Sequence, residues 1–259
     1  MIKRVALLVV LLVPGSLQAA KDKDKASLPS VIELAAITAR GRMLQEYDVA
    51  AWHASDAVVA LKPDESLAPV YIAKKIASGW EVAFGRLNEG RDGFLIVYRA
   101  SQGASATEFT VKKTDPPVED KGFYLAAAKA IETASRDFGK PSRPYNTYVL
   151  PSENDQLYVY LLPAQTVNGI YPLGGDVRYT IAADGGSILE KRQMHKSILE
   201  PNIGQNLAAS YHTHILSNLP EDSDVFHVLT RKPSIPEIVG GADKHVYEVQ
   251  TDGSIKRIK

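Results

Sequence analysis

The chain has 259 residues, 30 basic and 30 acidic side chains, and no cysteine. The lack of cysteine excludes disulfides, thiolate metal ligands, a cysteine nucleophile and a lipid anchor on an N-terminal cysteine. An apolar content of 45% is ordinary for a globular protein, and the length is sufficient to bury a core. The balanced charge lacks the basic excess that phosphate binding requires, so nucleic acid is not an expected partner.

The first twenty residues have the pattern of a Sec-type signal peptide. Lys3 and Arg4 precede the apolar run 5–13, and small residues follow up to Ala19 and Ala20. A membrane span needs about twenty apolar residues, and this run is less than half that length. We therefore expect cleavage near Ala19 or Ala20 and a periplasmic or secreted protein without a transmembrane segment. Removal of the two basic residues leaves 28 against 30 acidic ones, a mature charge of −2.

Two helices are predicted after a flexible charged lead-in over residues 21–29. Ser30 and Glu33 form a capping-box pattern, which opens an apolar periodicity that continues to Lys62, with Gly41 as a potential break. The second helix is predicted over 123–138, where an alanine-rich stretch ends at a glycine.

Alternating apolar residues and turn signals predict strands in most of the remaining chain. These are 80–84, 94–98, 109–111, 145–150, 157–162, 177–181, 188–189, 208–215, 225–230, 245–249 and a last strand at 255. Short turns between them favour an α+β fold, with two helices packed on mainly antiparallel meander sheets. We expect an N-terminal helix-plus-meander unit over 30–115 and a C-terminal helix-plus-antiparallel-sheet unit over 118–259. The two units are either two small domains or an old duplication.

Histidines are concentrated near the C-terminus, at positions 195, 212, 214, 227 and 245. In a strand, His212 and His214 point to the same face about 7 Å apart, so both could bind one ion. A third ligand would complete a zinc-type divalent metal site, and the candidates are His227, Asp222 and Asp224. Glu221 is the candidate base for a metal-bound water.

The third ligand depends on strand register. If 208–215 and 225–230 pair as antiparallel strands with His214 opposite His227, the two histidines share a face. A shift of one residue turns His227 away and leaves Asp222 or Asp224 as the candidate. In a third interpretation the histidines only form hydrogen bonds, and the acidic run 221–224 is a solvated turn.

The segment from Ala208 to Asp224 resembles part of the JAMM-type metallopeptidases, whose pattern is His-x-His, seven residues, Ser, two residues, Asp. His212 and His214 match the paired histidines, whereas Ser223 is followed directly by Asp224. The resemblance implies a zinc-dependent, isopeptidase-type hydrolase with the paired histidines as ligands. It covers less than a tenth of the chain.

Two functions follow from these patterns. The first is a non-enzymatic binding or interaction module with an unknown envelope or extracellular partner, favoured because no complete catalytic set is visible. The second is a metal-dependent hydrolase centred on His212 and His214. Neither a Gly-x-Ser-x-Gly elbow nor a phosphate-binding glycine loop occurs in the sequence, so serine hydrolases and nucleotide-binding proteins are not indicated.

Overall fold

The structure is a computed structural model that describes residues 31–201 and 207–259. The predicted signal peptide, the charged lead-in and Ser30 lie outside the described residues. Three α-helices are described: α1 (Val31–Val59), α2 (Phe123–Phe138) and α3 (Asp222–Thr230), with short 3-10 helices η1 (Glu65–Leu67) and η2 (Glu153–Asp155). No helix in the described ranges is both long and apolar enough to span a membrane.

The strands form three four-stranded sheets and one two-stranded pair. The first sheet is the meander β1 (Val70–Ile76), β2 (Gly79–Leu87), β3 (Phe94–Gln102) and β4 (Phe109–Asp120). The second contains β5 (Tyr145–Pro151), β6 (Leu157–Pro163), β8 (Val177–Ile181) and β9 (Ile188–Gln193). The third contains β11 (Ser210–Thr213), β12 (Glu237–Gly240), β13 (Val246–Val249) and β14 (Ile255–Arg257). β7 (Leu173–Gly174) pairs with β10 (Ile198–Leu199).

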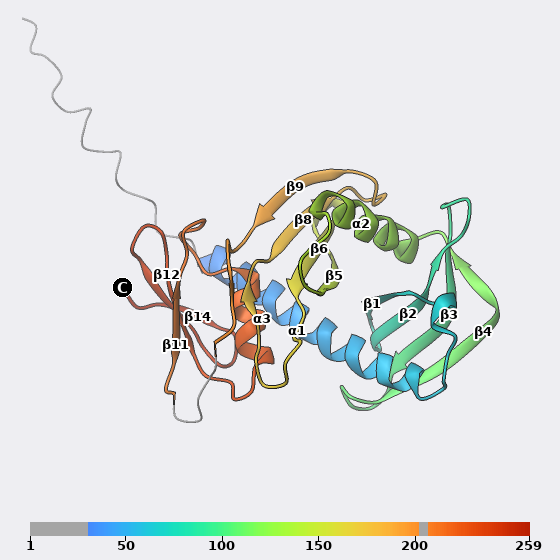
Figure 1. The fold of residues 1–259 in the computed structure, drawn as a ribbon, viewed down its shortest axis with the longest axis horizontal. Helices are drawn as coiled ribbons and strands as arrows, with labels where there is room; N and C mark the ends of the chain where they lie inside the picture. The colour runs from blue at the N-terminus through green and yellow to red at the C-terminus, as the bar shows by residue number, and fades with distance from the viewer. Residues whose placement is uncertain (1–30, 202–206) are drawn as a thin grey trace, which may run out of the picture.

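The predicted α+β fold with mainly antiparallel sheets is confirmed, since β11 and β12 form the one parallel pair among the described strands. Helix α1 runs along the molecule and contacts the first sheet at one end and α3 at the other (Figure 1). The second sheet, covered by α2, lies between these two regions (Figure 1).

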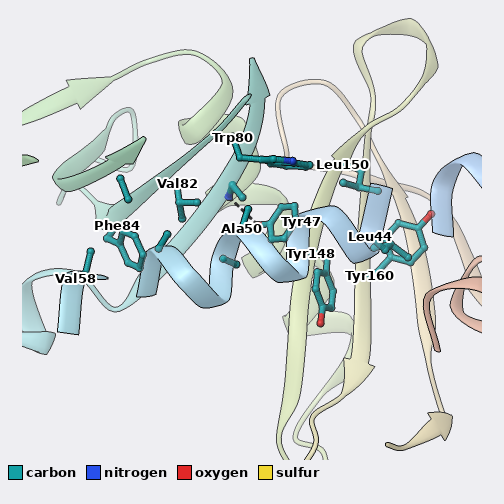
Figure 2. Close-up of a cluster of buried hydrophobic side chains, with 14 of the residues drawn as sticks. Leu44, Tyr47, Ala50, Val58, Trp80, Val82, Phe84, Tyr148, Leu150 and Tyr160 are labelled. Carbon is teal, nitrogen blue, oxygen red and sulfur yellow. Dashed lines mark hydrogen bonds between the residues drawn. The ribbon is translucent and has the colours of Figure 1, made fainter. Parts of the chain in front are cut away.

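Aromatic side chains of α1 and the first two sheets form the central core (Figure 2). Tyr47 of α1 packs edge-to-face against Trp80 of β2 and Tyr148 of β5. Its hydroxyl accepts a hydrogen bond of 3.0 Å from the backbone N–H of Ala73, so the buried phenol is satisfied. Buried residues of α1, mostly three or four positions apart, therefore pack against both sheets.

Strand β6 of the second sheet is buried on both faces, because α1 packs on one face and α2 on the other. Tyr160 of β6 points to α1, whereas Val159 and Leu161 point to α2. β8 and β9 continue this sheet beyond β6, and the chain leaves the end of β9 toward the third sheet.

The predicted strand over 225–230 is wrong, because this segment lies in α3. Glu221 caps α3 in a capping box with Asp224, and Val225 and Val228 are buried at helical spacing. The antiparallel pairing of His214 with His227 is therefore also wrong: β11 pairs with β12, which was not predicted. Strand β1 was not predicted either.

Helix α1 is continuous through Gly41, so the potential break there is not observed. A Cβ on Gly41 would lie 2.4 Å from Cβ of Val225 and 2.7 Å from the carbonyl oxygen of Asp222. The lack of a side chain at Gly41 therefore allows the start of α3 to pack directly against α1.

Candidate metal centre

Four buried side chains direct one ligand atom each to a common point. They are His195, His212, His214 and Asp224, named here the histidine–aspartate group, and this group could hold a metal ion. Nε2 of His214 lies 2.9 Å from Nε2 of His195 and 3.0 Å from Nε2 of His212. The carboxylate oxygens of Asp224 lie 3.1–3.2 Å from the three Nε2 atoms. Ligand atoms about 2.0 Å from a tetrahedral zinc ion are about 3.3 Å apart, which is close to these distances.

Three separate segments supply the group. His195 follows β9, His212 lies in β11, and His214 follows that strand directly. Asp224 is the third residue of α3 and the partner of Glu221 in its capping box. Its Oδ2 accepts a hydrogen bond of 2.7 Å from the backbone N–H of Glu221. Helix capping therefore positions Asp224, and the alternation of side chains along β11 and the residue after it places His212 and His214 on the same side of the chain.

Each histidine has its other ring nitrogen held by an acceptor. Nδ1 of His195 lies 2.8 Å from Asp176, and Nδ1 of His212 lies 2.9 Å from Glu237. Nδ1 of His214 lies 2.7 Å from the carbonyl oxygen of Leu219. A carboxylate or carbonyl oxygen accepts, so each Nδ1 carries the hydrogen, and each Nε2 turns its lone pair or a second proton toward the common point. Such outer carboxylates are typical of metal-bound histidines.

Asp224 has a buried oxygen without a hydrogen bond. Its Oδ1 is close to Nε2 of both His195 and His212, but neither contact has the direction of a hydrogen bond. Nε2 of His214, by contrast, is within hydrogen-bond distance and direction of Nε2 of both His195 and His212. An ion at the common point would satisfy Oδ1 of Asp224.

The charges of the group favour a bound cation or protons. Burial disfavours ionisation of Asp224, but the three histidines outweigh it and hold its pKa well below the ordinary value. Burial also opposes charge on His212, yet Asp224 and Glu237 raise its pKa to about 9. Protons and a metal ion therefore compete for the same nitrogen atoms.

A second buried network anchors the start of α3 beside the group. Asp222 receives Nε of Arg40 at 2.9 Å, an N–H of Arg178 at 2.6 Å and the hydroxyl of Tyr160 at 2.9 Å. These partners come from α1, β8 and β6. The network therefore ties the helix that carries Asp224 to the first helix and the second sheet.

The structure brings together only part of the residues predicted for the site. His212, His214 and Asp224 belong to the histidine–aspartate group, whereas Asp222 forms the ion pairs above. His227 is buried in α3 outside the group, and burial together with Arg231 lowers its pKa to about 4.

Glu221, the candidate base, is also buried rather than part of a solvated turn. It accepts two hydrogen bonds, of 3.0 and 2.7 Å, from Arg192.

Sequence reasoning counted His195 among the C-terminal histidines but did not assign it to the site. Its outer partner Asp176 and the partner of His212, Glu237, were not singled out either. No spacing pattern in the sequence links His195 to His212, because the two segments approach each other only in the folded chain.

A pocket of about 350 Å³ adjoins the group. All three histidines line it, whereas Asp224 does not. The pocket therefore lies on the histidine side of the group, away from the carboxylate.

Comparisons of the chain with protein-family models, curated proteins and solved structures found no match.

Proposed function

We propose that this chain is an exported metal-binding protein in which the histidine–aspartate group holds a zinc-type divalent ion for binding rather than hydrolysis. The observation that carries the proposal is the convergence of three Nε2 atoms and one carboxylate oxygen that has no hydrogen bond. Hydrogen bonds between the histidines would satisfy the Nε2 atoms, but they leave Oδ1 of Asp224 buried without a partner among the described residues, and a bound ion would satisfy it.

The donor set selects the kind of ion. Imidazole nitrogens suit zinc, copper, iron and nickel, and a carboxylate oxygen is also a common zinc ligand. Zinc is usually held by four such donors, and the four ligand atoms lie within 4.8 Å of one another. We therefore expect zinc to bind more tightly than magnesium or calcium, which prefer all-oxygen sites.

Binding rather than hydrolysis follows from two features of the site. Catalytic zinc centres combine three protein ligands with one water, whereas here the fourth donor is a protein side chain. In addition, the candidate base Glu221 is held by both nitrogens of the Arg192 fork and does not line the adjoining pocket. Among the described residues that line the pocket, none carries a carboxylate.

The first experiment is elemental mass spectrometry of the mature protein purified without a histidine tag. We expect close to one zinc per chain, and loss of zinc in a His212→Ala/His214→Ala variant. The matched control is His245→Ala, because this histidine lies in the same C-terminal region but pairs only with Asp243 at 2.7 Å.

The outcomes separate clearly. Zinc in the wild type and the control, but not in the double variant, supports the proposal. A wild type that takes up no divalent ion, even after incubation with zinc and removal of the excess, refutes it. Zinc that stays in the double variant refutes the assignment to this group.

A further inference from the structure

On its carboxylate side, the histidine–aspartate group is closed by packed helices. Asp224 is fully buried, and the next residue, Val225, packs directly against α1 at Gly41. Val228, which lies one turn further along α3, is fully buried as well. An ion that approached the group from this side would have to separate α3 from α1.

The sides beyond the Nδ1 atoms of the histidines are closed by buried acceptors. Asp176 beside His195 is 1% exposed, and Glu237 beside His212 is 2% exposed. Glu237 also accepts a hydrogen bond from Arg231, which is fully buried. These contacts hold the imidazoles in place and block approach to the group from behind the rings.

The remaining side opens into the adjoining pocket of about 350 Å³. Of the four members of the group, only the three histidines have any exposed area, between 4% and 8%, and all three line this pocket. Exposed residues such as Ser197 and Thr213 line it as well. The pocket therefore connects the group with solvent.

The buried charges around the group attract cations. When the imidazoles are neutral, as they must be to bind a metal ion, Asp224, Asp176 and Glu237 contribute three negative charges and Arg231 contributes one positive charge. The neighbouring Asp222 and its two arginines together add one positive charge, so the total remains negative. A cation that has entered the pocket is therefore drawn toward the group.

Lys196 places a positive charge on the way to this negative interior. It lines the pocket and is exposed, and no arginine or carboxylate occurs among the described residues that line the pocket. We propose that the pocket is the route by which the ion enters and leaves the group, and that Lys196 slows its entry. The inference rests on the metal ion proposed above, and it assigns to the pocket the control of how fast that ion exchanges.

The lack of cysteine in the chain allows a single thiol to be placed on the pocket wall. Ser197→Cys is loaded with zinc, freed of excess ion, and then labelled with either bulky fluorescein maleimide or methyl methanethiosulfonate, which adds only a methylthio group. Release of zinc to an excess of a chromogenic chelator is followed by absorbance. We expect the bulky label to slow release about tenfold or more relative to the small label, because local unfolding is then the remaining path.

The matched control is Ser105→Cys with the same two labels. Ser105 is exposed in the loop between β3 and β4, and these strands lie at the opposite end of the molecule from β11 (Figure 1). Both labels on this control should give the same rate of zinc release.

Uptake of zinc by the metal-free Lys196→Glu variant tests the charge. We expect an association rate about threefold or more above that of the wild type at low ionic strength, and a difference that shrinks as salt is added. Lys113→Glu on β4, which removes an exposed lysine far from the pocket, should match the wild type.

Each result has one meaning. Slow release with the bulky label at residue 197 but not at residue 105, together with faster, salt-sensitive uptake by Lys196→Glu, supports the proposal. Release that the bulky label at residue 197 does not slow, or that it slows equally at residue 105, overturns the route. Uptake by Lys196→Glu at the wild-type rate overturns the role of that lysine. These contrary results leave the metal proposal standing, whereas a wild type that binds no zinc overturns both proposals.

Discussion

Zinc should stabilise the folded chain, and His195→Ala should remove most of this stabilisation. The proposed zinc ion would join the loop after β9, the end of β11 and the start of α3, three segments that separate on unfolding. A ligand that binds only the folded state at one hundred times its Kd contributes about 2.7 kcal/mol. For a domain of this size, each kcal/mol raises Tm by about 2–4 °C, so we expect a rise of about 5–10 °C.

The effect of His195→Ala follows from the number of ligands. Structural zinc sites contribute about 10–16 kcal/mol through four ligands, or about 3 kcal/mol per ligand, so loss of one weakens binding about 100-fold or more. At the same zinc concentration the stabilisation then falls to about 0.4 kcal/mol, and the rise in Tm to about 1 °C. The variant tests the ligand that lies outside the His-x-His motif.

Thermal melts followed by circular dichroism, after removal of metal by chelation and stepwise return of zinc, measure both shifts. His245→Ala is the control and should keep the full rise. An equal rise in His195→Ala and the wild type would refute the role of His195. A wild type without any rise would refute the joining of the three segments by zinc.

Three further predictions concern the surroundings of the group. Asp222→Ala should lower the free energy of unfolding by about 1.5–3 kcal/mol in urea titrations, because it leaves two half-buried arginines without their counter-charge; a cost below 1 kcal/mol would contradict this. Gly41→Ala, which normally stabilises a helix, should cost about 1–3 kcal/mol, because the new Cβ would collide with Val225; a higher Tm would contradict the close contact. Burial raises the pKa of Asp48 despite its hydrogen bond from Tyr148, so its protonated form is favoured in the folded state, and its contribution to stability is lost as pH rises through the folded-state pKa. Asp48→Asn should therefore raise Tm at pH 7, with a difference from wild type that disappears on acidification to below the ordinary carboxyl pKa; a difference independent of pH would contradict this.

The elements with strong local patterns could be predicted from sequence. The α1 and α2 periodicities appear near their predicted positions, and so do the strands of the first two sheets other than β1. Residues 225–230 are the instructive error, since Val225, Phe226 and Val228 suit a strand by composition. The capping box of Glu221 and Asp224, together with the contact of Val225 with α1, stabilises this segment as a helix.

For the candidate site, the sequence by itself determined the inward pairing of His212 and His214, because alternation along a strand is a local property. It also placed carboxylates nearby, but it could not select among them. Only the tertiary structure brought in His195 and chose Asp224 over Asp222, since these choices depend on how β9, β11 and α3 pack. Residues two apart in one strand are placed by the local backbone geometry alone. Ligands from distant segments converge only when tertiary contacts, such as those of Asp222 with Arg40 and Arg178, fix the elements that carry them.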